Sequence, residues 1–272
     1  MTAAVSPPAG PSGSIRAMVR PALQIALALL LAAPSASAAP KLRVVVDPGH
    51  GGKMYGASGV GGMKEAELCL ELAGRVAKAL ERTVSAQVVL TRTQDVELSL
   101  PDRVAFANRE RADLFISIHG NSMPTRRLKA QAQGIETYFL SVAASGDAAR
   151  RTAERENAEA GAGPLPSADP LGYILQDLAR SEAHQDSSRL AYAVHQKIIG
   201  ATGAEDRGVQ QAPFFVLHGV DAPAILIEVG FISHPDEGKR LKDPKYQELL
   251  AGALAQGVKA YREQVAGATG AR

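Results

Sequence analysis

Short apolar runs alternate with stretches of helical periodicity along most of the chain. The runs are rich in Val, Ile, Leu and Phe and show little alternation with polar residues. This pattern is typical of strands that are buried on both faces of a sheet. The predicted strands are Arg43–Val46, Ala86–Thr91, Asp113–Ile118, Ile135–Leu140, Phe214–Leu217 and Ala224–Ile227.

Between these runs, apolar residues recur at the spacing of a helix face. Glu65–Arg82, Leu98–Asn108 and Leu241–Tyr261 are therefore predicted helices. Alternating strands and helices predict an α/β fold. We expect a single domain over residues 39–272, with a mostly parallel mixed sheet of about six strands flanked by helices.

Residues 141–187 interrupt this alternation. Ser141–Glu159 is helix-prone and heavily charged, Ala160–Pro170 is rich in Gly, Pro and Ala, and Leu171–His184 is again helical in pattern. A long insertion between two segments of a sheet is typical of a lid or a regulatory element. We therefore expect an inserted helical segment with a regulatory role.

Residues 1–38 have the pattern of a secretory signal peptide with an N-terminal extension. Arg16 and Arg20 precede an apolar run from Ala22 to Ala33, and small residues follow at positions 36 and 38. The run is shorter than the roughly 20 residues that a membrane-spanning helix needs. The mature protein is therefore expected in the periplasm or secreted; an uncleaved membrane anchor is the alternative interpretation.

The charge balance and the cysteine content exclude some classes of protein. The chain has 30 basic and 28 acidic residues, and removal of Arg16 and Arg20 with the signal peptide leaves 28 of each. A nucleic-acid-binding protein needs a basic surplus, so no nucleic-acid partner is expected. Cys69 is the single cysteine, which excludes an internal disulfide. The sequence shows no large exposed apolar motif, so we expect a monomer.

Three ionisable residues directly follow predicted strands. His50 lies in Asp47-Pro-Gly-His-Gly-Gly52 after the first strand, His119 follows the third, and Glu228 follows the last. Ligands of open α/β sheets bind outside the carboxyl ends of the strands, so these residues are expected to converge at one edge. Glu65 begins the first predicted helix and is expected beside the loop that follows the first strand.

This set of residue types suits a catalytic metal. Two histidines and one carboxylate are a standard three-ligand set for catalytic zinc, with a fourth position left for water. A second carboxylate can then take a proton from that water. Glu228 suits this second role, because it ends a very apolar run, where an unpaired charge would cost on the order of several kcal/mol.

Each of these residues also has a purely structural interpretation. His50 can be a turn residue, and His119 can be a core histidine with satisfied hydrogen bonds. Glu65 can be a carboxylate favoured by the dipole of a helix N-terminus, and Glu228 can be the partner of an arginine. Four such coincidences at the strand ends of one sheet are much rarer than one, which favours the catalytic interpretation.

The motifs, taken in order, resemble the zinc N-acetylmuramoyl-L-alanine amidases of the AmiA/AmiB/AmiC type. The likeness extends from about Leu42 into the C-terminal helix, and Gly120 stands where this family usually has Ala. The matching segments are Asp47-Pro-Gly-His-Gly-Gly52, Lys64-Glu65, Thr91-Arg92-Thr93, Ser117-Ile-His-Gly-Asn121, Arg207–Leu217 and Glu228-Val-Gly-Phe-Ile-Ser233.

The resemblance implies an enzyme that cleaves the amide bond between N-acetylmuramic acid and L-alanine in peptidoglycan, in cell-wall remodelling at division. It implies that Zn²⁺ is held by His50, Glu65 and His119, and that Glu228 is the catalytic carboxylate. Asn121 and His218 are candidate substrate contacts. Zinc is the expected cofactor, and peptidoglycan is the expected partner.

The resemblance also implies regulation. Ala148–Ala160 resembles the regulatory helix of the division-associated members, in which a glutamate occupies the open position of the metal until an activator removes the helix. Glu156 is the first candidate for this glutamate and Glu154 the second. The activator would be a periplasmic LytM-type protein. The alternative is a solvated charged helix, because Arg/Glu runs are usually exposed faces.

Two other classes of protein were weighed against this one. A metallocarboxypeptidase usually carries Glu three residues after its first metal-binding His, whereas Lys53 follows His50 at that spacing. A non-catalytic wall-binding or partner-activating protein with the same fold predicts damaged ligands, whereas His50, Glu65, His119 and Glu228 are all present.

Overall fold

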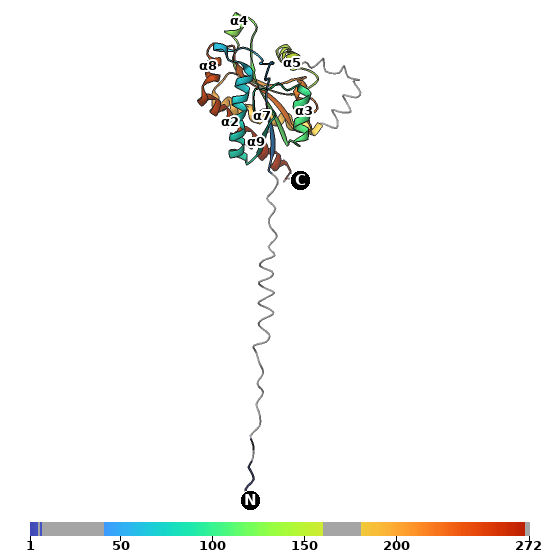
Figure 1. Cartoon of the computed structure of the whole chain (residues 1–272). Coiled ribbons are helices and arrows are strands. Elements are labelled where there is room, and N and C mark those ends of the chain that lie inside the picture. Colours follow the sequence, from blue (N-terminus) through green and yellow to red (C-terminus); the bar gives the residue numbers. More distant parts are fainter. Residues whose placement is uncertain (5, 7–40, 160–180, 270–272) are drawn as a thin grey trace. The chain divides into compact units, whose positions relative to one another are not determined.

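The structure, a computed structural model, describes residues 1–4, 6, 41–159 and 181–269. Two compact units separate at Pro40, and all described helices and strands belong to the second, Lys41–Arg272 (Figure 1). The expected signal peptide lies almost wholly outside the described residues. None of the described helices has both the length and the apolar character that a membrane span requires.

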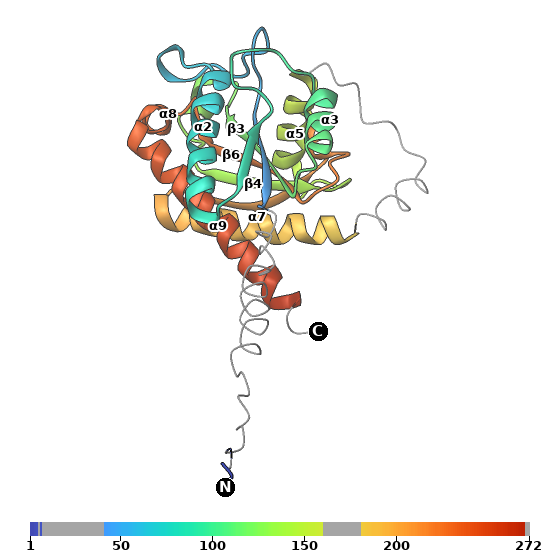
Figure 2. The same cartoon turned by 60° about the horizontal axis from the view of Figure 1, so that its bottom comes forward.

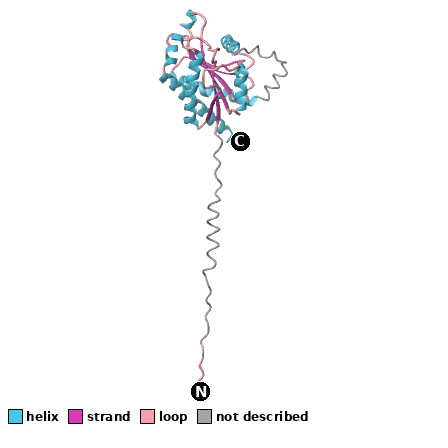
Figure 3. Cartoon of the chain, in the orientation of Figure 1, coloured by secondary structure: helices cyan, strands magenta, loops and turns pink. Residues whose placement is uncertain are grey.

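A six-stranded sheet forms the centre of the second unit (Figure 3). Its order is β2-β1-β3-β6-β4-β5, and every neighbouring pair is parallel except β4 and β6. The predicted mixed, mostly parallel sheet is therefore confirmed. The strands are β1 (Arg43–Pro48), β2 (Gln87–Leu90), β3 (Leu114–Asn121), β4 (Ile135–Leu140), β5 (Asp206–Ala212) and β6 (Ala224–Phe231).

Helices cover both faces of the sheet (Figure 2). On one face lie α2 (Glu65–Val84), α7 (Ser181–Thr202) and α9 (Pro244–Thr269), which share one Val, Ile and Leu core with the strands. On the other face lie α3 (Leu100–Arg109) and α5 (Asp147–Glu159). Because apolar side chains are buried on both sides, the central strands lack the alternation of a half-exposed sheet.

Shorter helices occupy the connecting segments: η2 (Val60–Gly62), α4 (Arg126–Lys129), η3 (Phe215–Leu217) and α8 (Glu237–Lys242).

One predicted strand was wrong. Phe214–Leu217 forms a 3₁₀ turn, η3, and the fifth strand is the preceding segment, Asp206–Ala212. Phe214 and Leu217 are apolar because they are buried in the core beneath α3 and α5. β5 lies at the edge of the sheet and is mostly half-buried, so it carries few of the apolar residues that mark a central strand.

The predicted helices Glu65–Arg82 and Leu98–Asn108 correspond to α2 and α3, whereas Leu241–Tyr261 is divided between α8 and α9. Pro244 begins α9, and a proline has no backbone N–H with which to continue a preceding helix.

The expected insertion contains one described helix of its own, α5, which begins at Asp147. Residues 160–180 lie outside the described part. From Ser181 the chain forms α7, which continues to Thr202 and buries Leu190, Val194 and Ile198 against the sheet and α9. The last residues of the expected insertion are therefore the first turns of a helix of the main core.

Candidate metal centre

The carboxyl ends of β1, β3 and β6 bring the proposed site residues together. His50 follows β1 directly, and His119 and Glu228 face each other in register on the adjacent strands β3 and β6. Glu65 is the first residue of α2. Three neighbouring strand ends and one helix start thus meet at one edge of the sheet, as the sequence pattern predicts.

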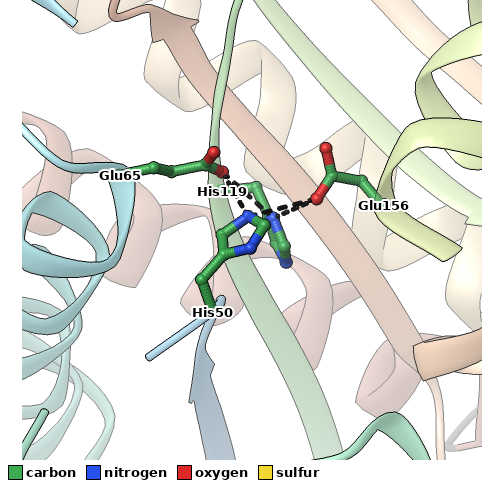
Figure 4. Close-up of side chains that lie close together, drawn as sticks. All are labelled: His50, Glu65, His119 and Glu156. Carbon is green, nitrogen blue, oxygen red and sulfur yellow. Dashed lines mark hydrogen bonds and ion pairs between the residues drawn. The ribbon is translucent and has the colours of Figure 1, made fainter. Parts of the chain in front are cut away.

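Four buried side chains converge there: His50, Glu65, His119 and, from α5, Glu156 (Figure 4). Glu65 Oε1 lies 2.9 Å from His50 Nε2 and 3.2 Å from His119 Nδ1. From the opposite side, Glu156 Oε2 lies 3.2 Å from His50 Nε2 and 2.9 Å from His119 Nδ1. One donor atom from each residue lies within 4.8 Å of the other three.

This geometry fits a small divalent cation. Ligand atoms at zinc-bonding distance in a tetrahedral site are about 3.3–3.6 Å apart. The four contacts of 2.9–3.2 Å are somewhat shorter, so the side chains lie near the spacing that such a site requires. Glu156 Oε2 is buried and has no hydrogen-bond partner among the described residues, although two imidazole nitrogens lie close to it. A buried carboxylate oxygen that faces two imidazole nitrogens without a hydrogen bond is placed as a metal ligand is.

The electrostatics of the cluster favour a positive charge at its centre. Burial is the largest single influence on Glu65 and opposes its ionisation, but the charge of His50 and the hydrogen bonds with His119 and His50 together outweigh it and lower the pKa of Glu65 to about 2. Burial likewise opposes protonation of His119, but the charge of Glu156 raises the pKa of His119 to about 9. The two carboxylates thus favour a positive charge in the space between them. A metal cation held there by neutral imidazoles would supply that charge in place of the protons.

The orientation of Glu65 is set by backbone groups. Its Oε2 accepts a hydrogen bond of 2.9 Å from the N–H of Ala57, and its Oε1 accepts one of 3.0 Å from the N–H of Gly120. A Cβ atom at Gly120 would lie 2.7 Å from Ile232 Cγ2 and 3.8 Å from Glu65 Cγ. Gly120, the departure from the usual Ala, therefore matches the close approach of Ile232 in this chain.

Gly49 gives the His119 ring its space. A Cβ atom at position 49 would lie 2.5 Å from Cε1 and Nε2 of His119. We expect Gly49→Ala to displace the ring and to weaken zinc binding by about 10- to 100-fold, as measured by competition with a chelator. Gly74→Ala is the matched control, since a Cβ at this helical glycine meets nothing within 4 Å. Equal zinc affinity in the two variants would contradict this account of the loop.

Glu228 is fully buried beside the cluster and is not one of its four members. Its Oε1 lies 3.4 Å from a guanidinium nitrogen of Arg155 on α5, and its Oε2 has no hydrogen-bond partner among the described residues. Burial, followed by the negative charge of Glu156, raises the pKa of Glu228 well above its usual range. A carboxylate in this position can accept a proton from a molecule that enters the site.

The structure distinguishes the two candidate regulatory glutamates. Glu156 points into the cluster, whereas Glu154 is exposed and accepts a hydrogen bond of 2.8 Å from Arg150 on the same helix. The sequence analysis missed Arg155, because a charge in an Arg/Glu run usually lies on a solvated face. The helical spacing of the residues that α5 buries is the signal that could have indicated that Arg155 lies beside the site.

The two candidate substrate contacts lie outside the cluster, and their role stays a prediction. Asn121 is buried at the end of β3, where its amide donates to Glu136 and accepts from the N–H of Ser122. His218 is half-buried at the end of η3, with its ring 6.4 Å from that of Phe215.

A glutamate does follow a histidine at the carboxypeptidase spacing elsewhere in the chain, at His234 and Glu237, but both are used structurally. His234 Nδ1 accepts the N–H of Glu237, and the Glu237 carboxylate accepts the N–H groups of Gly134 and Phe231.

A cavity of about 330 Å³ opens beside the metal cluster. His50, His119 and Glu156 form its inner wall, and Leu98 and Leu100 are among the apolar residues that line the rest. A substrate in this cavity would therefore have direct access to the ligand atoms.

An α/β sheet that presents two imidazoles and several carboxylates at its strand ends, next to a cavity, has the arrangement that metal-assisted hydrolysis requires. The sequence profile of the family described as N-acetylmuramoyl-L-alanine amidase, Amidase_3, matches residues 44–260. The chain belongs to this family, and the resemblance inferred from its motifs is confirmed.

Known relatives agree with this assignment. The chain is 34% identical to N-acetylmuramoyl-L-alanine amidase AmiC of Escherichia coli O6:H1 (strain CFT073), over 80% of its own length and 52% of AmiC. It is also 34% identical to AmiA of Escherichia coli K12, over 80% of its length and 75% of AmiA. The crystal structure of an N-acetylmuramoyl-L-alanine amidase from Clostridium difficile 630 aligns with a TM-score of 0.62 and 31% identity, over 82% of this chain and 97% of that one. This chain thus spans about half the length of AmiC.

Proposed function

We propose that the protein is a zinc enzyme that hydrolyses the amide bond between N-acetylmuramic acid and L-alanine in peptidoglycan. The observation that carries the proposal is the cluster of two imidazoles and two carboxylates, with the additional buried carboxylate of Glu228 beside it. We further propose that the protein acts outside the cytoplasm, in cell-wall remodelling at division. The signal-peptide pattern of residues 1–38 supports export.

The residues of the site divide into a binding set and a proton-transfer group. His50, Glu65 and His119 would hold the ion, which when bound supplies a water molecule of lowered pKa and polarises the scissile carbonyl. Glu228 accepts the proton of the attacking water at Oε2 and delivers a proton to the nitrogen of L-alanine as the amide bond breaks. The products are the free carboxyl group of the muramic acid and a stem peptide with a free amino terminus.

The test combines metal content with product analysis. Purified protein that begins at residue 39 is incubated with zinc, its bound metal is counted, and purified muropeptides are added. We expect about one zinc ion per chain and stem peptides that begin with L-alanine. Cleavage within the peptide would indicate a carboxypeptidase, and metal binding without cleavage of muropeptides or sacculi would indicate a wall-binding protein. Either result would overturn the proposal.

We also propose that α5 inhibits the resting enzyme at two points. Glu156 Oε2 occupies the side of the ligand cluster opposite Glu65, where the water would otherwise bind. Arg155 donates to Glu156 Oε1 at 2.9 Å and to Glu228 Oε1 at 3.4 Å, so the proposed base is paired with a cation of the same helix. The helix thus covers the metal position and the proton acceptor together.

The contacts of α5 suit a helix that can be removed. Its buried apolar side chains include Ala149 and Ala153, each of which contributes little more than one methyl group to the core. Asn157 attaches the helix to the turn before η3, with an amide donor to the carbonyl of Pro213 and an acceptor for the N–H of Phe215, both at 2.8 Å. A periplasmic LytM-type activator that competes for these few contacts would open the site.

Glu156→Ala is expected to raise the basal rate on labelled sacculi by on the order of 10-fold at saturating zinc. The substitution vacates one position of the ligand cluster and leaves His50, Glu65 and His119 in place. Glu154→Ala is the matched control, because Glu154 is a glutamate of the same helix with an exposed side chain. An unchanged or lower rate for Glu156→Ala, with zinc still bound, would show that Glu156 does not block the metal position.

A further inference from the structure

We propose that Arg92 and Arg103 are positioning residues, which fix His50 as a metal ligand by holding the carbonyl groups of the loop that carries it. The inference rests on the proposed metal site and adds two residues that are not among the four members of the metal cluster. Arg103 also lines the cavity beside the cluster, whereas Arg92 is not among the lining residues. Both arginine residues are 3% exposed. They come from different segments, Arg92 from the residues after β2 and Arg103 from α3.

The loop after β1 has an unusual backbone. His50, Gly51 and Gly52 have φ angles of 58°, 133° and 61°, so three consecutive residues depart from the conformations that most side chains favour. For a histidine, a left-handed conformation is unfavourable, because its Cβ atom comes too close to the following carbonyl oxygen. The loop is buried from Pro48 to Gly51, and buried carbonyl groups without donors would cost further free energy.

Arg103 satisfies two of these carbonyl groups. It donates to the carbonyl oxygen atoms of Pro48 and His50, each at 2.7 Å. The same guanidinium donates to Asp47 Oδ1 at 2.7 Å, at the end of β1. Asp47 is in turn held by Thr91 and Ser117, so Arg103 is fixed against the strands themselves.

Arg92 holds the same loop and also joins it to the segment that carries a second ligand, Glu65. Its Nε donates to the carbonyl of Pro48 at 3.0 Å, and one terminal nitrogen donates to the carbonyl of Gly49 at 2.7 Å. That nitrogen also donates to the carbonyl of Ala66 at 2.9 Å, in the residue next to Glu65. One guanidinium therefore sets the distance between the loop of His50 and the start of α2.

The chemistry of these contacts requires arginine. The guanidinium is planar and has five N–H donors in a fixed arrangement, so it can serve several diverging carbonyl groups at once. A lysine ammonium in the same place keeps the charge, but it is a compact group at the end of a flexible side chain and lacks the fixed planar arrangement of donors. Lysine variants of Arg92 and Arg103 should therefore retain the buried cation and lose the geometry of the loop.

The test measures zinc affinity separately from stability. Arg103→Lys and Arg92→Lys are compared with Arg109→Lys, an exposed arginine of the same helix as Arg103. Zinc dissociation constants are measured by chelator competition on protein shown to be folded by circular dichroism, and melting temperatures are measured without zinc. We expect the dissociation constants of the first two variants to rise about 10- to 100-fold, and that of Arg109→Lys to stay unchanged.

The outcomes separate the two proposals. If the unmodified protein binds no zinc, the proposed function fails. If it binds zinc and the folded Arg92→Lys and Arg103→Lys variants bind it equally well, with only a lower melting temperature, the two arginines are merely structural and the inference fails. Arg92→Lys leaves the pair of Asp47 and Arg103 intact, so it serves where Arg103→Lys does not fold. Loss of folding in both variants would also overturn the inference.

Discussion

Glu228→Gln is expected to reduce the rate of stem-peptide release by about 10²- to 10⁴-fold while the protein keeps its zinc. Glutamine preserves the volume of the fully buried side chain, but its amide cannot accept a proton from water. The three proposed ligands belong to other residues, so the metal site stays intact. The measurement pairs the initial rate on purified muropeptides with the zinc content of the same preparation.

Glu154→Gln is the control, because Glu154 is an exposed glutamate of α5, and this variant should retain full activity and full zinc content. Two results would refute the assignment of Glu228 as the base. Undiminished turnover would show that another group takes the proton. Loss of zinc along with activity would show that Glu228 is a ligand, in which case the division of roles between Glu228 and the four-residue cluster is wrong.

His119→Ala is expected to abolish zinc binding and activity together. His119 Nδ1 lies within 3.2 Å of both Glu65 Oε1 and Glu156 Oε2, so its loss leaves the two buried carboxylates with His50 as the remaining imidazole of the cluster. Two ligands of the proposed three are too few for a catalytic zinc site. Zinc content after dialysis and the rate of peptide release provide the readout.

His195→Ala separates the loss of a ligand from the general cost of removing a buried histidine. His195 is 3% exposed, contacts Thr137 of β4 and Asp206 of β5, and is not a member of the metal cluster. We expect this variant to melt at a lower temperature and to retain stoichiometric zinc. If His119→Ala also retained zinc while folded, the ligand set proposed here would be wrong.

The two parts of α5 that reach the site explain why a single substitution is an incomplete test of inhibition. Glu156→Ala leaves Arg155 within 3.4 Å of Glu228, so the proton acceptor stays paired. Arg155 also donates to the carbonyl of Ser122, which holds its guanidinium over the strand ends. Full release therefore requires that the helix itself move, which is the step that an activator would provide.

Sequence patterns predict the structure best where burial and strand direction act together. Val44–Val46 and Ala224–Ile227 are apolar because helices cover both faces of the sheet. The residues that directly follow such strands must meet at one edge of a parallel sheet. For that reason the sequence alone places His50, His119 and Glu228 together.

Apolar runs do not predict strands correctly where residues are apolar, or polar, for a reason other than their place in a central strand. Phe214–Leu217 is apolar because a turn is buried beneath two helices, and periodicity does not distinguish a buried turn from a strand. β5 is an edge strand, whose polar residues reduce the signal. The helical spacing of apolar residues continues from α8 into α9 across Pro244, although the helix itself is interrupted there.

By itself the sequence determined the α/β class, the edge of the sheet at which the chemistry lies, and the types of residue that can bind a metal there, since each depends on hydrophobic periodicity and chain direction. Only the tertiary structure decided that Glu156 rather than Glu154 faces the cluster, that Arg155 pairs with Glu228, and that Arg92 and Arg103 converge on one loop. These contacts join segments that are far apart in the chain. Packing and the rotation of a helix about its axis determine which residues meet, and local sequence patterns do not encode either of them.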